Sequence, residues 1–206
     1  DFIGERTRFP VNGKCARSQL MSVRDCQAIT KKAIVERLRG RYRTDWFVED
    51  AETVSIDVAL HGDVAQLTLD ASGTALNRRG YRTWNGEAPL RETLAAALVS
   101  LSPWRPGMPL HDPMCGTGTL MIEAAMRMAH RAPGLTREFA IESWRNMPTE
   151  AFGDIREQAR AEFDPSRIEG ISGSDIDPEA VELANRHLKQ AGLAGRVRFE
   201  TADMHD

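Results

Sequence analysis

Two patterns of apolar residues organise the first third of the chain: a helical repeat and a pair of alternating stretches. Apolar residues recur at helical spacing over 23–39, and Ser22 stands where an N-cap is expected. The expected apolar stripe is Cys26, Ile29, Ala33, Ile34 and Leu38, and the expected outer face is Arg24, Lys31, Lys32 and Arg39. Residues 54–60 and 65–69 alternate apolar with polar or small side chains around the segment HGD at 61–63, which predicts a β-hairpin.

Neither pattern runs through residues 71–85, which hold two glycines and the run NRRGYR at 77–82. The chain is therefore expected to divide there, with a partial domain at 1–72, a linker at 73–87 and a second domain at 88–206. Trp84 lies beside the arginines of this linker, where its ring either packs in a core or stacks on a base.

Strands and helices alternate in the second domain. A helix is expected from Pro89 to the residue before Pro103, and the elements expected after it are strand 109–112, helix 119–130, strand 168–175, helix 178–191 and strand 197–202. This order predicts an α/β fold built on a parallel sheet. The insertion at 131–167 is expected to decorate the sheet without taking part in the chemistry.

The composition fits a folded globular protein, because 41% of the residues are hydrophobic and 28% are charged. The three cysteines lack the spacing of a disulfide framework or a zinc site, and the five histidines lack ligand spacing, so we expect no metal and a reducing cytoplasm. No apolar run approaches the roughly 18 residues of a membrane span, so no membrane association is expected. The chain begins with Asp1 and ends abruptly at Asp206, which suggests a piece of a longer protein.

Charge is distributed unevenly along the chain. Residues 1–43 carry 11 Lys and Arg against 4 Asp and Glu, a net charge of +7, whereas the remainder carries −10. A polyanion bound by this N-terminal part is one explanation, and a solvated helix face explains the charge equally well.

The segment DPMCGTGT at 112–119 joins an expected strand to an expected helix through two glycines. Glycines at 116 and 118 allow a sharp turn and a close backbone approach to a ligand, and the N–H groups that open a helix attract a carboxylate. A dinucleotide fingerprint needs a third glycine where Met121 stands, and the lysine of a phosphate-binding P-loop is absent. Taken alone, the glycines are explained most simply by a tight turn that binds nothing.

Acidic residues at the tips of the next two strands add the missing information. Asp175 follows a buried strand and could accept hydrogen bonds from both hydroxyls of a ribose, while Ile176 offers an apolar surface to an adenine ring. Asp177 is expected to cap the following helix, because Pro178 occupies the first helical position. Asp203 follows the third strand and could accept the adenine amine. The glycine loop and these acids together predict a site for S-adenosylmethionine (SAM).

Two long segments resemble methyltransferases that act on exocyclic amino groups of bases. They are DPMCGTGTLMIEAA at 112–125 and GSDIDPEAVELANRHLKQAG at 173–192, and Thr117 replaces the serine of the common loop DPxCGSGT. Three others resemble bacterial proteins that join an RNA-binding THUMP domain to a methyltransferase domain, the 23S rRNA guanine-N2 methyltransferase family. These are SVRDCQAITKKAIVERL at 22–38, TLDASGTALNRRGYR at 68–82 and APLRETLAAAL at 88–98.

The resemblance implies a SAM-dependent methyltransferase whose partner is RNA and whose target is guanine N2 in 23S rRNA. It implies that SAM is held by Asp112, Pro113, Cys115, Gly116, Thr117, Gly118, Thr119, Asp175, Ile176, Asp203 and Met204, with Thr93 closing over the methionine end. It implies that RNA is contacted by Lys14, Arg24, Lys31, Lys32, Arg78, Arg79 and Arg82. Cys115 is expected to be a small structural residue and not a nucleophile.

The sequence departs from the family in lacking its catalytic NPPY motif, whose Asn and Pro accept the hydrogens of the target amine and whose Tyr stacks on the base. We therefore expect this chain to bind SAM without transferring the methyl group, and its THUMP part to be incomplete. Two alternatives stay open: a DNA adenine-N6 methyltransferase, which shares the loop, and a non-catalytic RNA-binding or ribosome-assembly module.

Overall fold

The computed structural model describes residues 2–82 and 90–205, which form two compact units. Unit 1 comprises Asp1–Thr74 and Glu138–Thr149, and unit 2 comprises Ala75–Arg137 and Glu150–Asp206. This division differs from the expected boundaries, because residues 75–82 of the expected linker pack in unit 2 and part of the insertion packs in unit 1. The expected helix start at Pro89, the linker residues 83–87 and Trp84 lie outside the described residues.

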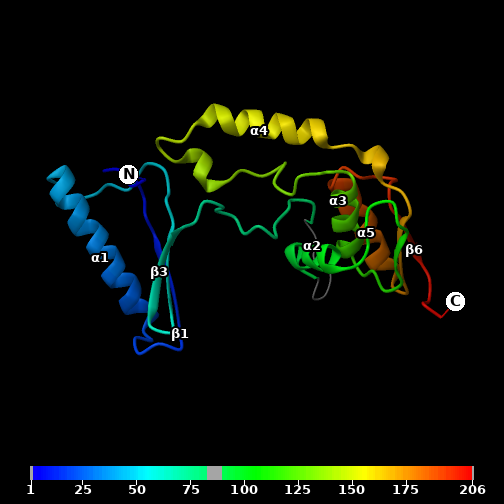
Figure 1. Ribbon diagram of the computed structural model, residues 1–206, viewed down its shortest axis with the longest axis horizontal. Coiled ribbons are helices and arrows are strands. Elements are labelled where there is room, and N and C mark those ends of the chain that lie inside the picture. Colours follow the sequence, from blue (N-terminus) through cyan, green and yellow to red (C-terminus); the bar gives the residue numbers. More distant parts are fainter. Residues whose placement is uncertain (1, 83–89, 206) are drawn as a thin grey trace. The chain divides into compact units, whose positions relative to one another are not determined.

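Unit 1 is a three-stranded sheet covered by a helix (Figure 1). Strand β1 (Val11–Ala16) pairs in parallel with β2 (Ile56–His61), which pairs antiparallel with β3 (Val64–Leu69). The predicted hairpin is confirmed, and its turn has two left-handed residues, Gly62 at φ +56° and Asp63 at φ +62°, a backbone that matches the twist of the strands. Helix α1 (Val23–Tyr42) packs on β1 and β2.

Helix α1 begins as predicted, and three of the five residues expected in its apolar stripe, Cys26, Ile34 and Leu38, are covered. Ser22 caps it, since its side chain accepts a hydrogen bond from the Asp25 N–H at 3.3 Å. Ile29, expected in the apolar stripe, is 61% exposed. Gln27 and Lys31 belong to the same covered stripe, whereas Ile29 and Ala33 lie outside it.

Lys31 consequently does not lie on the outer face, which corrects the sequence prediction. Its ammonium group bonds to the carbonyl of Phe9 at 3.2 Å and to the carboxylate of Glu49 at 2.7 Å. The same group lies 3.7 Å from the centre of the Phe9 ring, a cation–π contact. Because its ammonium group is paired within unit 1, Lys31 is not proposed to contact RNA.

The expected insertion contributes to both units instead of only decorating the sheet. Its short 3-10 helix η1 (Ala140–Ser143) bonds to unit 1, where the Ile141 N–H donates to the carbonyl of Ala71 at 3.1 Å. Trp144 is buried, and its indole N–H donates to the carbonyl of Thr53 at 3.1 Å. Helix α4 (Thr149–Glu162) and the 3-10 turn η2 (Pro165–Arg167) then lead into unit 2. Trp144 is therefore a packing residue of unit 1.

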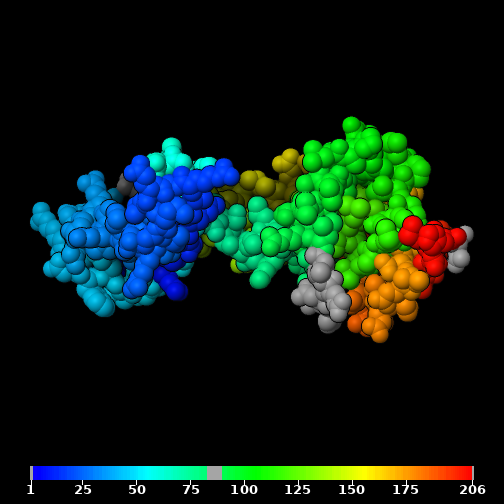
Figure 2. Space-filling model, turned by 90° about the horizontal axis from the view of Figure 1, so that it is seen from below, coloured from blue at the N-terminus to red at the C-terminus, as the bar shows by residue number. Residues whose placement is uncertain are grey.

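Unit 2 contains the predicted parallel sheet, in the order β4-β5-β6. Its strands are β4 (Leu110–Asp112), β5 (Ile171–Asp175) and β6 (Arg198–Thr201), and its helices are α2 (Glu92–Leu101), α3 (Thr119–Met128) and α5 (Pro178–Gln190). Met121, Ile122 and Leu188 are among its fully buried side chains. In the space-filling view, α5 and the chain after β6 form adjoining parts of the surface of this unit (Figure 2).

Among the described residues, no helix is long and apolar enough to cross a membrane.

Candidate functional site

The carboxyl ends of the three strands of unit 2 meet at one edge, where the candidate site lies. Asp112 of β4 pairs with Gly173 of β5, and Asp175 of β5 pairs with Thr201 of β6. Asp203 follows two residues after that pair. In an open parallel sheet this edge is where ligands bind, so the topology brings together the residues that the sequence placed at separate strand tips.

The glycine loop between β4 and α3 is fixed by bonds to the neighbouring strand. The Cys115 N–H donates to the carbonyl of Ser174 at 2.8 Å, and the Gly116 N–H donates to Oδ2 of Asp175 at 2.7 Å. Asp112 accepts the Met114 N–H at 3.1 Å, which tightens the turn out of β4. The loop is therefore preorganised by β5 and does not depend on a ligand for its shape.

The two loop glycines have different roles, which refines the prediction that both let a ligand approach. Gly116 has φ +52°, and a Cβ built on it meets nothing within 4 Å, so its backbone borders open space. Gly118 has φ +76° and caps α3, but a Cβ there would lie 2.7 Å from the Phe199 ring and 2.9 Å from Cβ of Ala184. Gly116 leaves room for a ligand, whereas Gly118 leaves room for the core.

Asp175 and Asp177 have different hydrogen-bonding roles, and the predicted helix cap at Asp177 is confirmed. Asp177 caps α5, because its side chain accepts the Glu179 N–H at 2.9 Å and Pro178 follows. Asp175 is half-buried and accepts the Asp177 N–H at Oδ1, at 3.0 Å, besides the Gly116 N–H. A carboxylate has about four acceptor positions, so Asp175 is oriented by these two bonds and retains capacity for further donors.

Other expected cofactor residues are exposed, and several of them directly follow the strand ends of this edge. Ile176 is 69% exposed and Met204 is 52% exposed. Asp203 is exposed and accepts the His205 N–H at 3.0 Å. Pro113 and Thr93 are also exposed, the latter on α2. An exposed isoleucine next to an oriented carboxylate suits a ligand with an apolar ring and a hydroxylated part.

Thr119, at the first position of α3, adds an observation that fits a bound group. Its side chain is 4% exposed, and its hydroxyl oxygen is buried without a hydrogen-bond partner among the residues that the structure describes. Buried hydroxyls are nearly always bonded. The Thr119 hydroxyl therefore lacks the hydrogen bond that a buried hydroxyl usually makes, and it belongs to the helix N-terminus where a polar ligand would bind.

Cys115 is a structural residue by its environment. It is buried beneath the loop, and burial together with the nearby carboxylates of Asp112 and Asp175 raises the pKa of its thiol to about 12. A thiol with that pKa is almost entirely protonated near neutral pH, and only the thiolate is a good nucleophile.

We accordingly expect Cys115 to resist alkylation in the folded protein. At pH 8 only about one thiol in ten thousand is ionised, given a pKa of about 12. Iodoacetamide treatment followed by peptide mass spectrometry should show Cys115 unmodified until urea unfolds the protein. Rapid labelling of Cys115 under native conditions would contradict this assignment.

The arginines of the expected RNA-facing linker divide into two groups, which corrects the prediction. Arg79 forms a buried ion pair with Glu123 of α3, with 10% and 3% of the two side chains exposed. Arg82 pairs with Glu92 of α2 at 2.9 Å, with 9% and 4% exposed. Both guanidinium groups are used inside unit 2, so neither is available to RNA. Lys14, Arg24, Lys32 and Arg78 are exposed.

Sequence reasoning missed the acidic and aromatic partners of these arginines. Glu123 accepts the Tyr81 hydroxyl at 3.0 Å in addition to Arg79, and burial raises the pKa of Glu123 while Arg79 acts in the opposite direction. Burial and the charge of Glu123 also raise the pKa of Tyr81. The available signal was a single acid within the apolar run TLMIEAAM at 119–126, since an unpaired acid rarely occupies a buried helix face.

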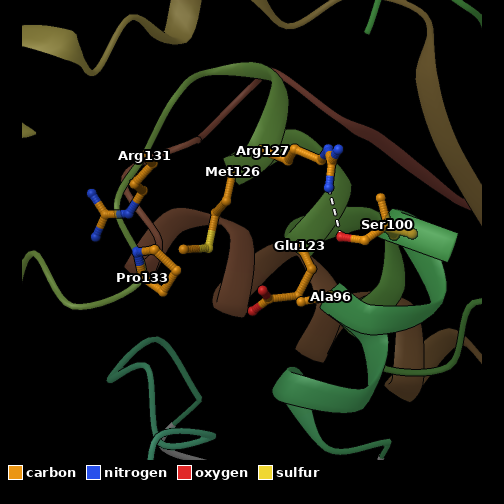
Figure 3. Close-up of a pocket in the computed structure, with 8 residues that line it drawn as sticks. Ala96, Ser100, Glu123, Met126, Arg127, Arg131 and Pro133 are labelled. Carbon is orange, nitrogen blue, oxygen red and sulfur yellow. Dashed lines mark hydrogen bonds between the residues drawn. The ribbon is translucent and has the colours of Figure 1, made fainter. Parts of the chain in front are cut away.

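A cavity of about 230 Å³ lies elsewhere in unit 2, between α2, the C-terminal half of α3 and the turn at 131–133 (Figure 3). Glu123 and Met126 face it from α3, and Arg127 donates to Ser100 Oγ of α2 at 2.6 Å. None of its lining residues belongs to the glycine loop.

No group of three or more His, Cys, Asp or Glu that could hold a metal occurs among residues 2–82 and 90–205.

Comparison with known families gives two matches. Residues 79–206 match the RMKL-like methyltransferase domain, and residues 1–70 match the THUMP domain. The first match alone covers more than half of the chain.

Individual relatives cover the whole chain. A Bacillus subtilis (strain 168) protein named "Putative RNA methyltransferase YpsC" is 41% identical over 207 residues, and the chain spans 54% of its length. A crystal structure of SMU.472, described as a putative methyltransferase complexed with SAH, has 35% identity and a TM-score of 0.92 over 100% of this chain and 55% of that chain. A structure from Listeria monocytogenes, described as a "predicted N6-adenine-specific DNA methylase", has 41% identity and a TM-score of 0.91 over 98% of this chain and 53% of that one.

Proposed function

Since the chain belongs to the family of RMKL-like methyltransferase domains and carries a THUMP domain ahead of it, we propose that the protein is a SAM-dependent RNA methyltransferase acting on guanine N2 in 23S rRNA in the cytoplasm. The observation that carries the proposal is the preorganised edge of unit 2. There, Gly116 borders open space while its N–H fixes the carboxylate of Asp175. A relative of the same fold was crystallised with SAH, the demethylated product of SAM.

The residues of this edge offer the polar groups and the apolar surface that SAM would need. The loop from Cys115 to Thr119, with Asp112 and Pro113, would hold the methionine part at the N-terminus of α3. Asp175 would accept the ribose hydroxyls, Ile176 and Met204 would cover the adenine, and Asp203 would accept its amine. Thr93 of α2 would close over the methionine end. Bound SAM would supply an activated methyl group on its sulfonium, and these residues would orient it.

The charge of unit 1 and the exposed basic side chain of Arg78 in the expected linker support RNA as the substrate. Residues 1–43 carry a net charge of +7, and the Bacillus relative is named as an RNA methyltransferase. The exposed side chains proposed to contact phosphates are Lys14, Arg24, Lys32 and Arg78. Because the NPPY motif is absent from this sequence, we propose that the chain by itself binds SAM without transferring the methyl group.

Replacing Asp175 by Ala is expected to weaken SAM binding by about 1 to 3 kcal/mol, as for loss of a hydrogen-bond partner at a charged group. Calorimetric titration of the intact protein with SAM measures this. Asp177→Ala is the matched control two residues away: it removes the cap of α5 and about 1 kcal/mol of stability, but it is expected to leave SAM affinity nearly unchanged. Equal losses of affinity in both variants would argue against the ribose role of Asp175.

Transfer of a labelled methyl group distinguishes the proposed function from its alternatives. The intact protein is incubated with labelled SAM and either 23S rRNA or duplex DNA, and labelled nucleosides are identified after digestion. N2-methylguanine in rRNA is the expected product, and N6-methyladenine in DNA would support the activity named for the Listeria relative. A folded protein that binds RNA, does not bind SAM and transfers no labelled methyl group would indicate a non-catalytic module.

A further inference from the structure

One peptide of the glycine loop is held at both of its ends. The Gly118 N–H donates to the carbonyl of Cys115 at 2.9 Å, and the carbonyl oxygen of Thr117 lies 3.2 Å from Nδ1 of His187. A carbonyl oxygen can only accept, so Nδ1 of His187 carries the hydrogen of this bond. With both the oxygen and the N–H engaged, the plane of the Thr117–Gly118 peptide is fixed, and with it the left-handed backbone at Gly118.

His187 belongs to the face of α5 that supports the loop. Its side chain is 0% exposed. One turn earlier, Ala184 lies where a Cβ on Gly118 would meet it at 2.9 Å. Helix α5 therefore gives the loop both a packing surface and a hydrogen-bond donor, and removing the donor would leave the Thr117 carbonyl with one bond fewer.

The imidazole ring has a fixed neighbour in Tyr81. The two ring centroids are 6.5 Å apart at an interplanar angle of 59°. The Tyr81 hydroxyl donates to Glu123 at 3.0 Å, and Arg79 pairs with the same carboxylate. The segment that precedes α2 and the middle of α3 thus restrain the surroundings of His187, so that its donor stays directed at the loop.

We propose that His187 is a positioning residue for SAM: by donating its Nδ1–H to the Thr117 carbonyl, it fixes the loop orientation in which Gly116 and the N-terminus of α3 meet the cofactor. His187 acts through the backbone and does not touch SAM. The inference rests on the proposed SAM site, because a fixed peptide matters here only if the open side of the loop receives a ligand.

The test compares two substitutions at this position in the intact protein. His187→Leu removes the donor, whereas His187→Asn keeps an N–H at a comparable distance from the backbone. Calorimetric titration with SAM is expected to give a Kd roughly tenfold higher for His187→Leu, the effect of about one lost hydrogen bond. His187→Asn is expected to recover most of the wild-type affinity. In steady state, the KM for SAM should rise more than kcat falls.

Leu193→Ala is the matched control for a general loss of stability. Leu193 is 0% exposed in the same core, past the end of α5, and its loss removes packing without removing a donor to the loop. At a temperature where every variant is folded, its Kd for SAM is expected to stay within about twofold of wild type, since no hydrogen bond to the loop is lost. A Leu193→Ala variant as weak as His187→Leu would show that stability alone explains the effect and would overturn the inference.

The remaining outcomes separate this inference from the proposed function. If wild type does not bind SAM, both fall; if wild type and His187→Leu bind SAM equally well, only the inference falls. Equally weak SAM binding by His187→Asn and His187→Leu also contradicts the inference, because only the Asn side chain keeps an N–H donor. Nitrogen NMR of histidine-labelled wild type with SAM needs no folded Leu variant: a hydrogen on Nδ1 of His187 is expected, and a bare Nδ1 would refute the bond.

Discussion

A Gly118→Ala variant is expected to lower the free energy of unfolding of unit 2 by about 2 to 5 kcal/mol and to abolish SAM binding. Two costs add. A non-glycine residue in the left-handed conformation costs about 1 to 2 kcal/mol, and an extra methyl group in a packed core costs about 1 to 3 kcal/mol. The methyl group would lie 2.7 Å from the Phe199 ring and 2.9 Å from Ala184, at φ +76°. Relief of this overlap would displace the loop from α5.

Gly195 provides the matched control for the backbone cost. It has φ +73°, and a Cβ built on it meets nothing within 4 Å. Gly195→Ala is therefore expected to lose only the conformational part, about 1 to 2 kcal/mol, and to keep SAM binding. Urea denaturation of the two variants measures the difference. Equal losses in both would show that the contacts of Gly118 with Phe199 and Ala184 carry no energetic weight.

A Glu123→Ala variant is expected to destabilise unit 2 by about 3 to 5 kcal/mol, because removing one member of a buried ion pair leaves the other charge uncompensated. Arg79 would keep its buried guanidinium, whose Nε and Nη2 each lie 3.3 Å from a carboxylate oxygen of Glu123. The buried hydroxyl of Tyr81 would lose its acceptor as well. Urea denaturation followed by circular dichroism measures the change.

Glu182 offers an exposed comparison for the same substitution. It pairs with Arg186 one turn later on α5, and 64% and 51% of the two side chains are exposed. Glu182→Ala is expected to change stability by about 0 to 1 kcal/mol, as for surface ion pairs. If Glu123→Ala were as mild as Glu182→Ala, the buried pair would not be holding residues 79–82 on α3.

The elements of both units could be predicted because local patterns determine them. Alternation set the hairpin, and the turn at 62–63 has the backbone expected for it. The alternation of strands and helices after residue 88 predicted the parallel sheet, since this connection has few solutions. The caps at Ser22 and Asp177 followed from residue type and from the position just before a helix.

The roles of individual charges could not be predicted, because they depend on partners distant in the sequence. Arg79 reads as part of a basic run, yet its partner Glu123 is 44 residues away. Lys31 was expected on the solvated face of α1, but it lies on the side that faces the sheet, and its ammonium group bonds to Glu49. The partner of Trp144 is equally distant, because its indole N–H donates to the carbonyl of Thr53 across 91 residues. A single sequence holds no record of such pairs.

By itself, the sequence determined where the glycine loop stands and which acids follow it at the strand tips, because a strand, a glycine turn and a helix are local structures. Only the tertiary structure decided what each loop residue does. Gly116 borders open space and Gly118 leaves room for core side chains, although both have left-handed backbones, because Phe199 and Ala184 approach only one of them. It also decided that Thr117 is held by His187, 70 residues further along the chain. The physical reason is that burial and hydrogen bonding are properties of neighbours in space, which a local pattern does not contain.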